Sequence, residues 1–169
     1  MNVSARLYSL PFRSVKTYLF ASLFIVGNIA LPQLCHLIPA GGPTWLPIYF
    51  FTLIAAYKFG LRVGLMTAIL SPLINHLLFG MPAAAVLSAI LIKSALLAGA
   101  AAWMAHRTQR VSLSALLVAI LAYQLIGTAC EWALCGDFML AAQDFRMGIP
   151  GMLLQLFGGY ATLKALNRI

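Results

Sequence analysis

Charged residues are scarce in this sequence of 169 residues, and acidic residues are the scarcest. Asp, Glu, Lys and Arg together make up 8% of the chain, whereas a soluble domain has about 25%. Only three residues are acidic against eleven Lys and Arg, so the formal net charge is +8. Hydrophobic residues make up 63% and the mean hydropathy is +0.96. This composition excludes an ordinary soluble domain and favours an integral membrane protein.

The sequence also lacks the motifs of common catalytic and nucleotide-binding sites. It has no Walker loop, no G-x-S-x-G and no H-E-x-x-H. The three cysteines, Cys35, Cys130 and Cys135, are odd in number and lack metal-binding spacing, which argues against a disulfide framework. His36 and His76 without a third close ligand make a weak case for a metal. We expect no catalytic residue, cofactor or metal, and any ATP-driven work must come from another polypeptide.

The basic residues gather in four clusters that are separated by long apolar stretches. Nine of the eleven fall into the clusters Arg6, Arg13 and Lys16; Lys58 and Arg62; Arg107 and Arg110; and Lys164 and Arg168. Cytoplasmic segments of membrane proteins are enriched in Lys and Arg, so the clusters predict an even number of spans with both termini cytoplasmic. The basic residues do not line one face together with aromatic residues, so we expect anionic lipid headgroups as their partners and no nucleic acid.

Breaks inside the apolar stretches predict six transmembrane helices. The segment 39–43 contains two prolines and two glycines, which a continuous helix cannot contain. The segment 80–82 and an outer loop with Asp137, Asp144 and Arg146 interrupt the other two stretches. The predicted spans are 17–36, 45–57, 61–79, 83–105, 112–135 and 148–166. The predicted fold class is therefore an all-α polytopic membrane protein, with one integral membrane domain over residues 1–169.

Two ionisable residues, Lys93 and Glu131, lie inside predicted spans. A charge at mid-bilayer costs roughly 2.5–3.5 kcal/mol, so such residues usually face a partner or a cavity. Side chains lean toward the N-terminus of their helix. Because these two spans run in opposite directions, both side chains lean toward a common depth in the outer half. They form either a buried ion pair that only neutralises both charges, or part of an outward-open cavity that recognises a charged small molecule.

Further polar and aromatic residues lie near the predicted outer side. Gln124 shares one face of its span with Glu131, and Asn75 and His76 point to the same end of the molecule. Two tryptophans belong either to a site or to the aromatic belt that membrane proteins place at the interface. The predicted substrate-binding residues are Trp45, Asn75, His76, Lys93, Gln124, Glu131 and Trp132.

The segment 38–82, IPAGGPTWLPIYFFTLIAAYKFGLRVGLMTAILSPLINHLLFGMP, resembles the substrate-binding S-components of energy-coupling factor (ECF) vitamin transporters. In that family a Pro/Gly-rich outer loop is followed by a hydrophobic helix, a short basic turn, a Gly/Ala-rich helix and a polar Gly/Pro segment. The corresponding parts of this chain are 39–43, 45–57, 58–62, 64–71 and 75–82. This segment covers about a quarter of the chain, and the length, the six spans and the cytoplasmic termini extend the resemblance.

The resemblance implies a substrate-binding subunit that captures a vitamin or related micronutrient at the outer side of a prokaryotic plasma (inner) membrane. Its partners would be a transmembrane scaffold protein and two ATPase subunits, and toppling of the S-component would carry the substrate inward. Family members often dock through an Ala-x-x-x-Ala face on helix 1. Ala21 and Ala30 do not have that spacing, so the small-residue stripe of the third span, with Gly60, Gly64 and Ala68, is an alternative docking face.

Two other classes of function remain open. A structural subunit that organises an envelope complex would need no ligand pocket, and Lys93 and Glu131 would then be a simple ion pair. A membrane enzyme using Cys35, His36, His76 or Glu131 ranks last, because no nucleophile–base arrangement is visible. A tightly bound small molecule in the purified protein would distinguish a binding subunit from both. Lys93 suggests an anionic group on that molecule, and Glu131 a cationic or donor group.

Overall fold

Apolar helices make up most of the chain that the computed structural model describes, residues 9–167. Four of them are long and apolar enough to cross a membrane: α1 (Val15–Cys35), α4 (Leu61–Phe79), α5 (Ala84–Thr108) and α6 (Leu113–Cys135). No β-strand occurs within residues 9–167. The all-α class is therefore confirmed, and the four long apolar helices are consistent with a membrane protein. The basic residues Arg6 and Arg168 lie outside the described part of the chain.

Shorter helical segments lie at the other two predicted positions. The 3-10 turn η1 (Pro47–Tyr49) and α3 (Phe50–Phe59) form one apolar segment. Near the C-terminus, α9 (Ile149–Leu153), the π-helical turn η2 (Leu154–Gly158) and α10 (Gly159–Leu166) follow one another directly. Three short helices occupy the connections: α2 (Gly41–Trp45), α7 (Phe138–Ala141) and α8 (Gln143–Met147). Helices therefore occupy all six predicted positions, and four of them have the length and hydropathy of a full span.

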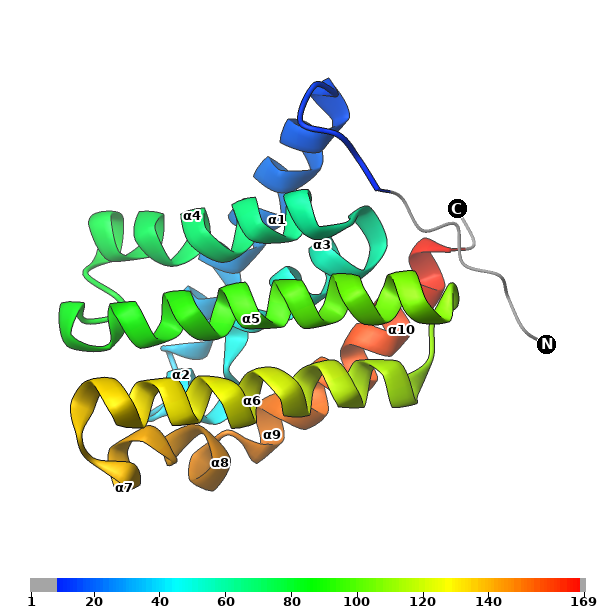
Figure 1. Cartoon of the computed structure of the whole chain (residues 1–169). Helices are drawn as coiled ribbons and strands as arrows, with labels where there is room; N and C mark the ends of the chain where they lie inside the picture. Colours follow the sequence, from blue (N-terminus) through cyan, green and yellow to red (C-terminus); the bar gives the residue numbers. More distant parts are fainter. Residues whose placement is uncertain (1–8, 168–169) are drawn as a thin grey trace.

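Apart from Lys93 and Arg146, the described basic residues gather at one end of the bundle, here termed the basic end. It carries the turns after α3 and α5, the start of α1 and the end of α10 (Figure 1). The backbone N–H of Leu10 donates to the carbonyl oxygen of Phe59 (3.4 Å), and Lys58 donates to the side-chain oxygen of Asn167. The opposite end, termed the acidic end, carries the α6–α9 connection with Asp137 and Asp144.

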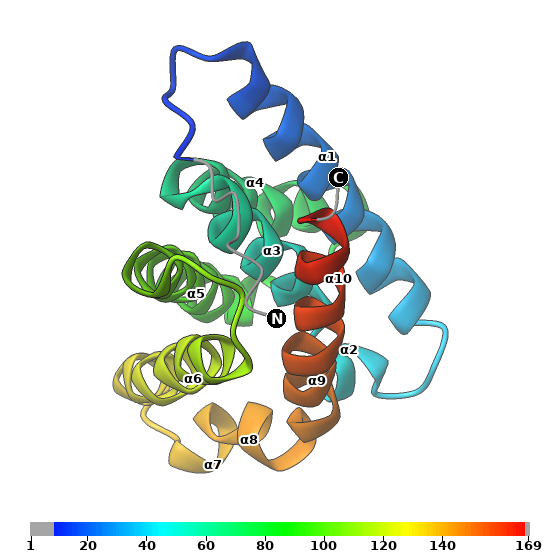
Figure 2. The ribbon, with the colours of Figure 1, turned by 90° about the vertical axis from the view of Figure 1, so that its right-hand side faces the viewer.

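Helix α3 lies at the centre of the bundle. Figure 2 looks along α4, α5 and α6, which form one layer, whereas α1 and α9–α10 lie on the other side and α3 lies between. All residues from 52 to 59 are buried. This enclosure fits the short length of α3 and the irregular turn before it. Non-helical backbone at membrane depth is tolerated where protein, and not lipid, surrounds it.

The small-residue stripe of α4 packs inside the protein. A Cβ atom at Gly64 would lie 2.4 Å from the Cβ of Ala56 in α3, a distance that real side chains do not reach. Ala68 and Pro72, farther along the stripe, are also buried. Small residues let helices in a membrane approach closely, and here they do so within the chain. The suggestion that this stripe docks to a scaffold protein is therefore wrong.

A buried polar network joins α1 to α3 and α4. The side-chain amide of Asn28 donates to Thr52 Oγ1 (3.0 Å), and its oxygen accepts from the backbone N–H of Phe51 (3.2 Å). That N–H lies in the first turn of α3, where backbone donors lack partners within the helix. Asn75 Nδ2 in turn donates to the backbone oxygen of Asn28 (2.9 Å). These bonds fix α1 against both helices and orient Asn75.

Candidate functional site

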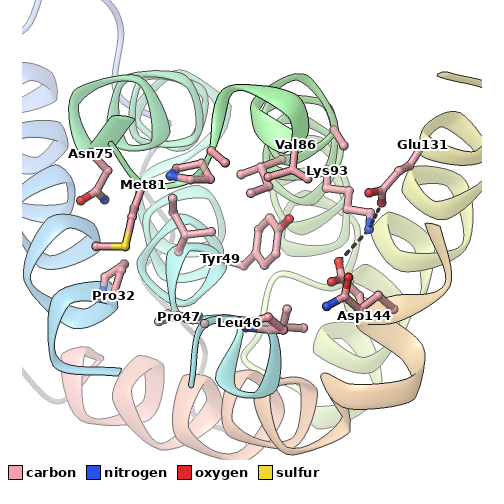
Figure 3. Close-up of a pocket in the computed structure, with 18 of the residues that line it drawn as sticks. Pro32, Leu46, Pro47, Tyr49, Asn75, Met81, Val86, Lys93, Glu131 and Asp144 are labelled. Atoms are coloured by element: carbon pink, nitrogen blue, oxygen red, sulfur yellow. Dashed lines mark hydrogen bonds and ion pairs between the residues drawn. The ribbon is translucent and has the colours of Figure 1, made fainter. Parts of the chain in front are cut away.

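A cavity of about 330 Å³ lies in the acidic end of the bundle. Its walls come from the end of α1, the turns around α2 and η1, the end of α4, the first half of α5, the end of α6 and the α7–α8 segment (Figure 3). Most of the lining is apolar, and it includes Pro47, Ile48, Val86 and Ile90. Polar side chains occupy only a few places on this wall, so each of them strongly affects which molecule could bind.

Lys93 stands on one side of the cavity between two carboxylates. Its Nζ lies 2.6 Å from Oε2 of Glu131 and 2.6 Å from Oδ2 of Asp144 (Figure 3). The Lys93 side chain is 2% exposed, and those of Glu131 and Asp144 are 13% and 18% exposed. The predicted meeting of Lys93 with Glu131 is confirmed, and Asp144 joins them. These three residues are termed the charged cluster.

Close helix packing determines where Lys93 lies. Helices α5 and α6 are adjacent and antiparallel, and Lys93 faces Gly127 of α6. A Cβ atom at Gly127 would lie 2.5 Å from Lys93 Cγ, so the missing side chain leaves the space that the lysine stem fills. The stem thus passes between the helices while Nζ reaches the two carboxylates. Such burial covers the apolar part of a lysine and leaves its ammonium group for polar partners.

Asp144 reaches the charged cluster because the loop after α6 folds back over the cavity. The carboxylate of Asp137 caps α7 by accepting from the N–H groups of Met139 (2.8 Å) and Leu140 (3.2 Å). Beyond α8, a Cβ at Gly148 would lie 2.6 Å from Cδ1 of Leu46, so the loop packs directly against the turn before η1. The α7–α8 segment is therefore held at both ends, and Asp144 on α8 points inward.

The charged cluster carries one positive and two negative groups, so its formal charge is −1. Only one oxygen of each carboxylate contacts Lys93. The other oxygen of Glu131 and of Asp144 accepts no hydrogen bond from any residue between 9 and 167. A carboxylate can accept up to about four hydrogen bonds. The cluster therefore presents unused acceptors at an acidic, largely apolar cavity.

Asn75 lies on the other side of the same cavity. It is 1% exposed, its Nδ2 donates to Asn28, and its oxygen accepts from Gln33 Nε2 (3.3 Å). Tyr49 lies between Asn75 and the charged cluster (Figure 3), and its ring centroid is 5.1 Å from that of Tyr123. Of the predicted site residues, Asn75, Lys93 and Glu131 therefore line one cavity.

The other four predicted site residues do not line this cavity. His76 Nδ1 lies 2.7 Å from the carbonyl oxygen of Pro82 and orients the turn that forms part of the wall. Gln124 is fully buried, and neither polar atom of its amide has a partner in the described chain. Trp45 is 36% and Trp132 is 51% exposed. A role of these four in substrate binding stays a prediction.

The lining includes residues that the sequence did not assign to the site. Asp144, Gln143 and Leu140 come from the α7–α8 segment, and Tyr49 comes from η1. The signal for Asp144 was its rarity, since it is one of only three acidic residues in the chain. Its pairing with Lys93 depends on how the loop folds back, which sequence spacing does not determine.

Within residues 9–167, no group of three or more His, Cys, Asp or Glu side chains is arranged to hold a metal ion. Comparisons with protein-family models, with curated proteins and with solved structures find no match to this chain. The geometry of the cavity is therefore the basis for assigning a function.

Proposed function

We propose that this chain is the substrate-binding S-component of an ECF-type importer and captures a small vitamin-like molecule in the membrane. One observation carries the proposal, namely the cavity of about 330 Å³ with a buried charged cluster on its wall. Sites for small organic molecules are concave, mostly apolar, about 300–1,000 Å³ in volume, and have a few well-placed polar groups. The cavity has each of these properties.

In this proposal all six helical segments cross a prokaryotic plasma (inner) membrane, with the basic end in the cytoplasm. Lysine and arginine favour the cytoplasmic side, and the described clusters lie together at that end. Both termini are then cytoplasmic. The cavity lies at the acidic end, so the substrate enters from the outer side. This orientation supports import.

The energy for transport would come from partner proteins. The sequence has no nucleotide-binding motif, so a transmembrane scaffold protein and two ATPase subunits would supply ATP hydrolysis. Because the α4 stripe is buried, the scaffold would contact a lipid-facing helix surface instead. The competing function is a structural subunit of an envelope complex, in which the charged cluster would only neutralise itself. The cavity beside the cluster favours binding of a ligand.

The test is whether the protein carries a small molecule in this cavity. Protein purified in mild detergent is examined by native mass spectrometry, and any released molecule is identified. Val86→Trp places a large side chain at a cavity-lining position, whereas Leu87→Trp adds the same side chain at the next position, which does not line the cavity. We expect ligand on the wild type and on Leu87→Trp but not on Val86→Trp. A wild-type protein without ligand, which no vitamin in a panel stabilises, would favour the structural role.

Co-purification tests the partners separately. Affinity purification of the tagged chain from its own membranes should recover a transmembrane scaffold protein and ATPase subunits. ATP hydrolysis by the isolated chain would contradict the assignment of energy supply to partner subunits.

A further inference from the structure

The charge on the cavity wall narrows the class of substrate. We propose that the substrate is an organic monocation with N–H donors at one end of an apolar body, and that its cationic group binds the free oxygens of Glu131 and Asp144. This inference rests on the proposed function, because it needs a ligand in the cavity. It goes further by specifying the charge of the ligand and the end of the cavity at which that charge lies.

The first reason is the charge imbalance at the cluster. Lys93 supplies one positive charge to two carboxylates, and no other Lys or Arg lines the cavity within the described chain. His36 also lines it, with Nδ1 2.6 Å from the carbonyl oxygen of Pro32. An uncompensated charge in a largely apolar, poorly solvated place is costly. A monocation would neutralise the cluster, whereas an anion would increase the imbalance.

The second reason is the hydrogen-bonding capacity that remains. The ammonium group of Lys93 has three donors, and its contacts with Glu131 and Asp144 use two. It therefore has little capacity left for an anionic ligand. Each carboxylate keeps one oxygen without a partner in the described chain. Donors on a cation form short, strong bonds with such oxygens, so a primary ammonium, an amidinium or a protonated ring N–H fits better than a quaternary ammonium.

The third reason is the rest of the cavity wall. Among the described residues, it has no charged side chain that could pair with a second charged group on the ligand. Pro32, Met81 and Asn75 lie on the side away from the charged cluster (Figure 3). The amide of Asn75 already bonds to Asn28 and to Gln33. Tyr49 lies between the two sides (Figure 3), and Ile48 adds to the apolar lining of the cavity. The body of the substrate is therefore apolar or weakly polar, and a dication or zwitterion would leave one charge unpaired.

The test compares three probes with one aromatic skeleton and different charges: phenethylammonium, phenethyl alcohol and phenylacetate. Binding to the wild-type protein in detergent is measured at pH 7 by thermal stabilisation and by displacement of any co-purified ligand. We expect the ammonium to bind best and phenylacetate worst. The molecule released from the purified protein should also be a cation at pH 7.

Isosteric variants test whether the charged cluster holds the cation. Asp144→Asn leaves a neutral Lys93–Glu131 pair. It should weaken the binding of phenethylammonium about thirty-fold or more, as expected for removal of one partner of a buried charge pair. The affinity for phenethyl alcohol should change little. Asp137→Asn is the matched control, because it makes the same charge change in the same loop outside the cavity, and Asn caps a helix about as well as Asp does. Glu131→Gln provides a second variant if Asp144→Asn does not fold.

The outcomes separate the inference from the proposed function. A released molecule that is neutral or anionic, or tighter binding of phenylacetate than of phenethylammonium, overturns the inference and leaves a substrate-binding protein. Unchanged phenethylammonium affinity in folded Asp144→Asn and Glu131→Gln overturns the placement of the cation. A wild-type protein that releases no molecule and binds none of the three probes counts against both.

Discussion

Replacement of Lys93 by Met should destabilise the protein. A second substitution, Asp144→Asn or Glu131→Gln, should recover most of the lost stability. Methionine matches the apolar stem of lysine in length and fills the space beside Gly127. It removes the one positive charge that Glu131 and Asp144 share. The two carboxylates then face each other in a site where they are 13% and 18% exposed.

The size of the effect follows from the geometry. Glu131 Oε2 and Asp144 Oδ2 each lie 2.6 Å from the same nitrogen, so these two oxygens are at most 5.2 Å apart. At an effective dielectric constant of about 20, two like charges at that distance repel by about 3 kcal/mol. Changing Asp144 to Asn as well removes the repulsion. Lys93→Met/Asp144→Asn should therefore be more stable than Lys93→Met by about 3 kcal/mol, or about 6–12 °C in melting temperature for a chain of this size.

The assay is thermal unfolding in detergent at pH 7 without added ligand, on the wild type, Lys93→Met, and Lys93→Met combined with Asp144→Asn or with Glu131→Gln. Arg146→Met is the control, since it makes the same loss of a positive charge at an exposed position on α8, the helix that carries Asp144. We expect Lys93→Met to be the least stable, both double variants to recover, and the control to match the wild type. If the double variants melt no higher than Lys93→Met, the repulsion argument is refuted.

Three further predictions concern packing and topology. Asn28→Leu should lower the free energy of unfolding by about 1–3 kcal/mol or more, because the Phe51 N–H of α3 loses its acceptor. Chemical or thermal unfolding measures the change in stability, and a variant as stable as the wild type would contradict the prediction. Gly151→Ala should destabilise by about 1–3 kcal/mol, because its Cβ would lie 2.5 Å from the Trp45 carbonyl group. A Cβ at Gly99 would have no atom within 4 Å, so Gly99→Ala should be neutral or stabilising and serves as the control. Equal melting temperatures for Gly151→Ala and Gly99→Ala would argue against the close packing of Gly151 on Trp45. Topology can be tested with an impermeant thiol reagent on a Cys35→Ala/Cys130→Ala background. The exposed native Cys135 should be labelled from outside, and a cysteine introduced by His106→Cys should be labelled only from inside. Labelling of both positions from the same side would exclude the proposed topology.

Much of the helical framework could be predicted from the sequence because two independent patterns agree. The basic clusters mark the turns at one end, and the Pro/Gly segments mark turns at the other. The third predicted span, 61–79, has the same bounds as α4, and the fifth, 112–135, differs from α6 by one residue. The meeting of Lys93 and Glu131 was also predictable, because both are costly to bury and lie on adjacent antiparallel helices.

The loops that complete the cavity could not be predicted in the same way. Asp144 reaches Lys93 only because α7 and α8 fold back over the helix ends, and Leu46 packs against Gly148 with a left-handed backbone (φ 46°). Such contacts join residues about fifty or a hundred positions apart, and helical periodicity does not predict them. Asn28 was missed for a related reason, since a single Asn in an apolar helix does not identify its partners on α3 and α4.

The position of Asp144 links the negative charge of the cavity to the loop segment that covers it. Lys93 and Glu131 lie on long helices, whereas Asp144 lies on the segment that covers the cavity. With that segment in place the cluster carries a formal charge of −1, and without Asp144 it would be neutral. A cation bound to Glu131 and Asp144 would thus be held by the covering segment as well as by α6. The surplus carboxylate would therefore serve both selectivity for a cation and retention of that cation.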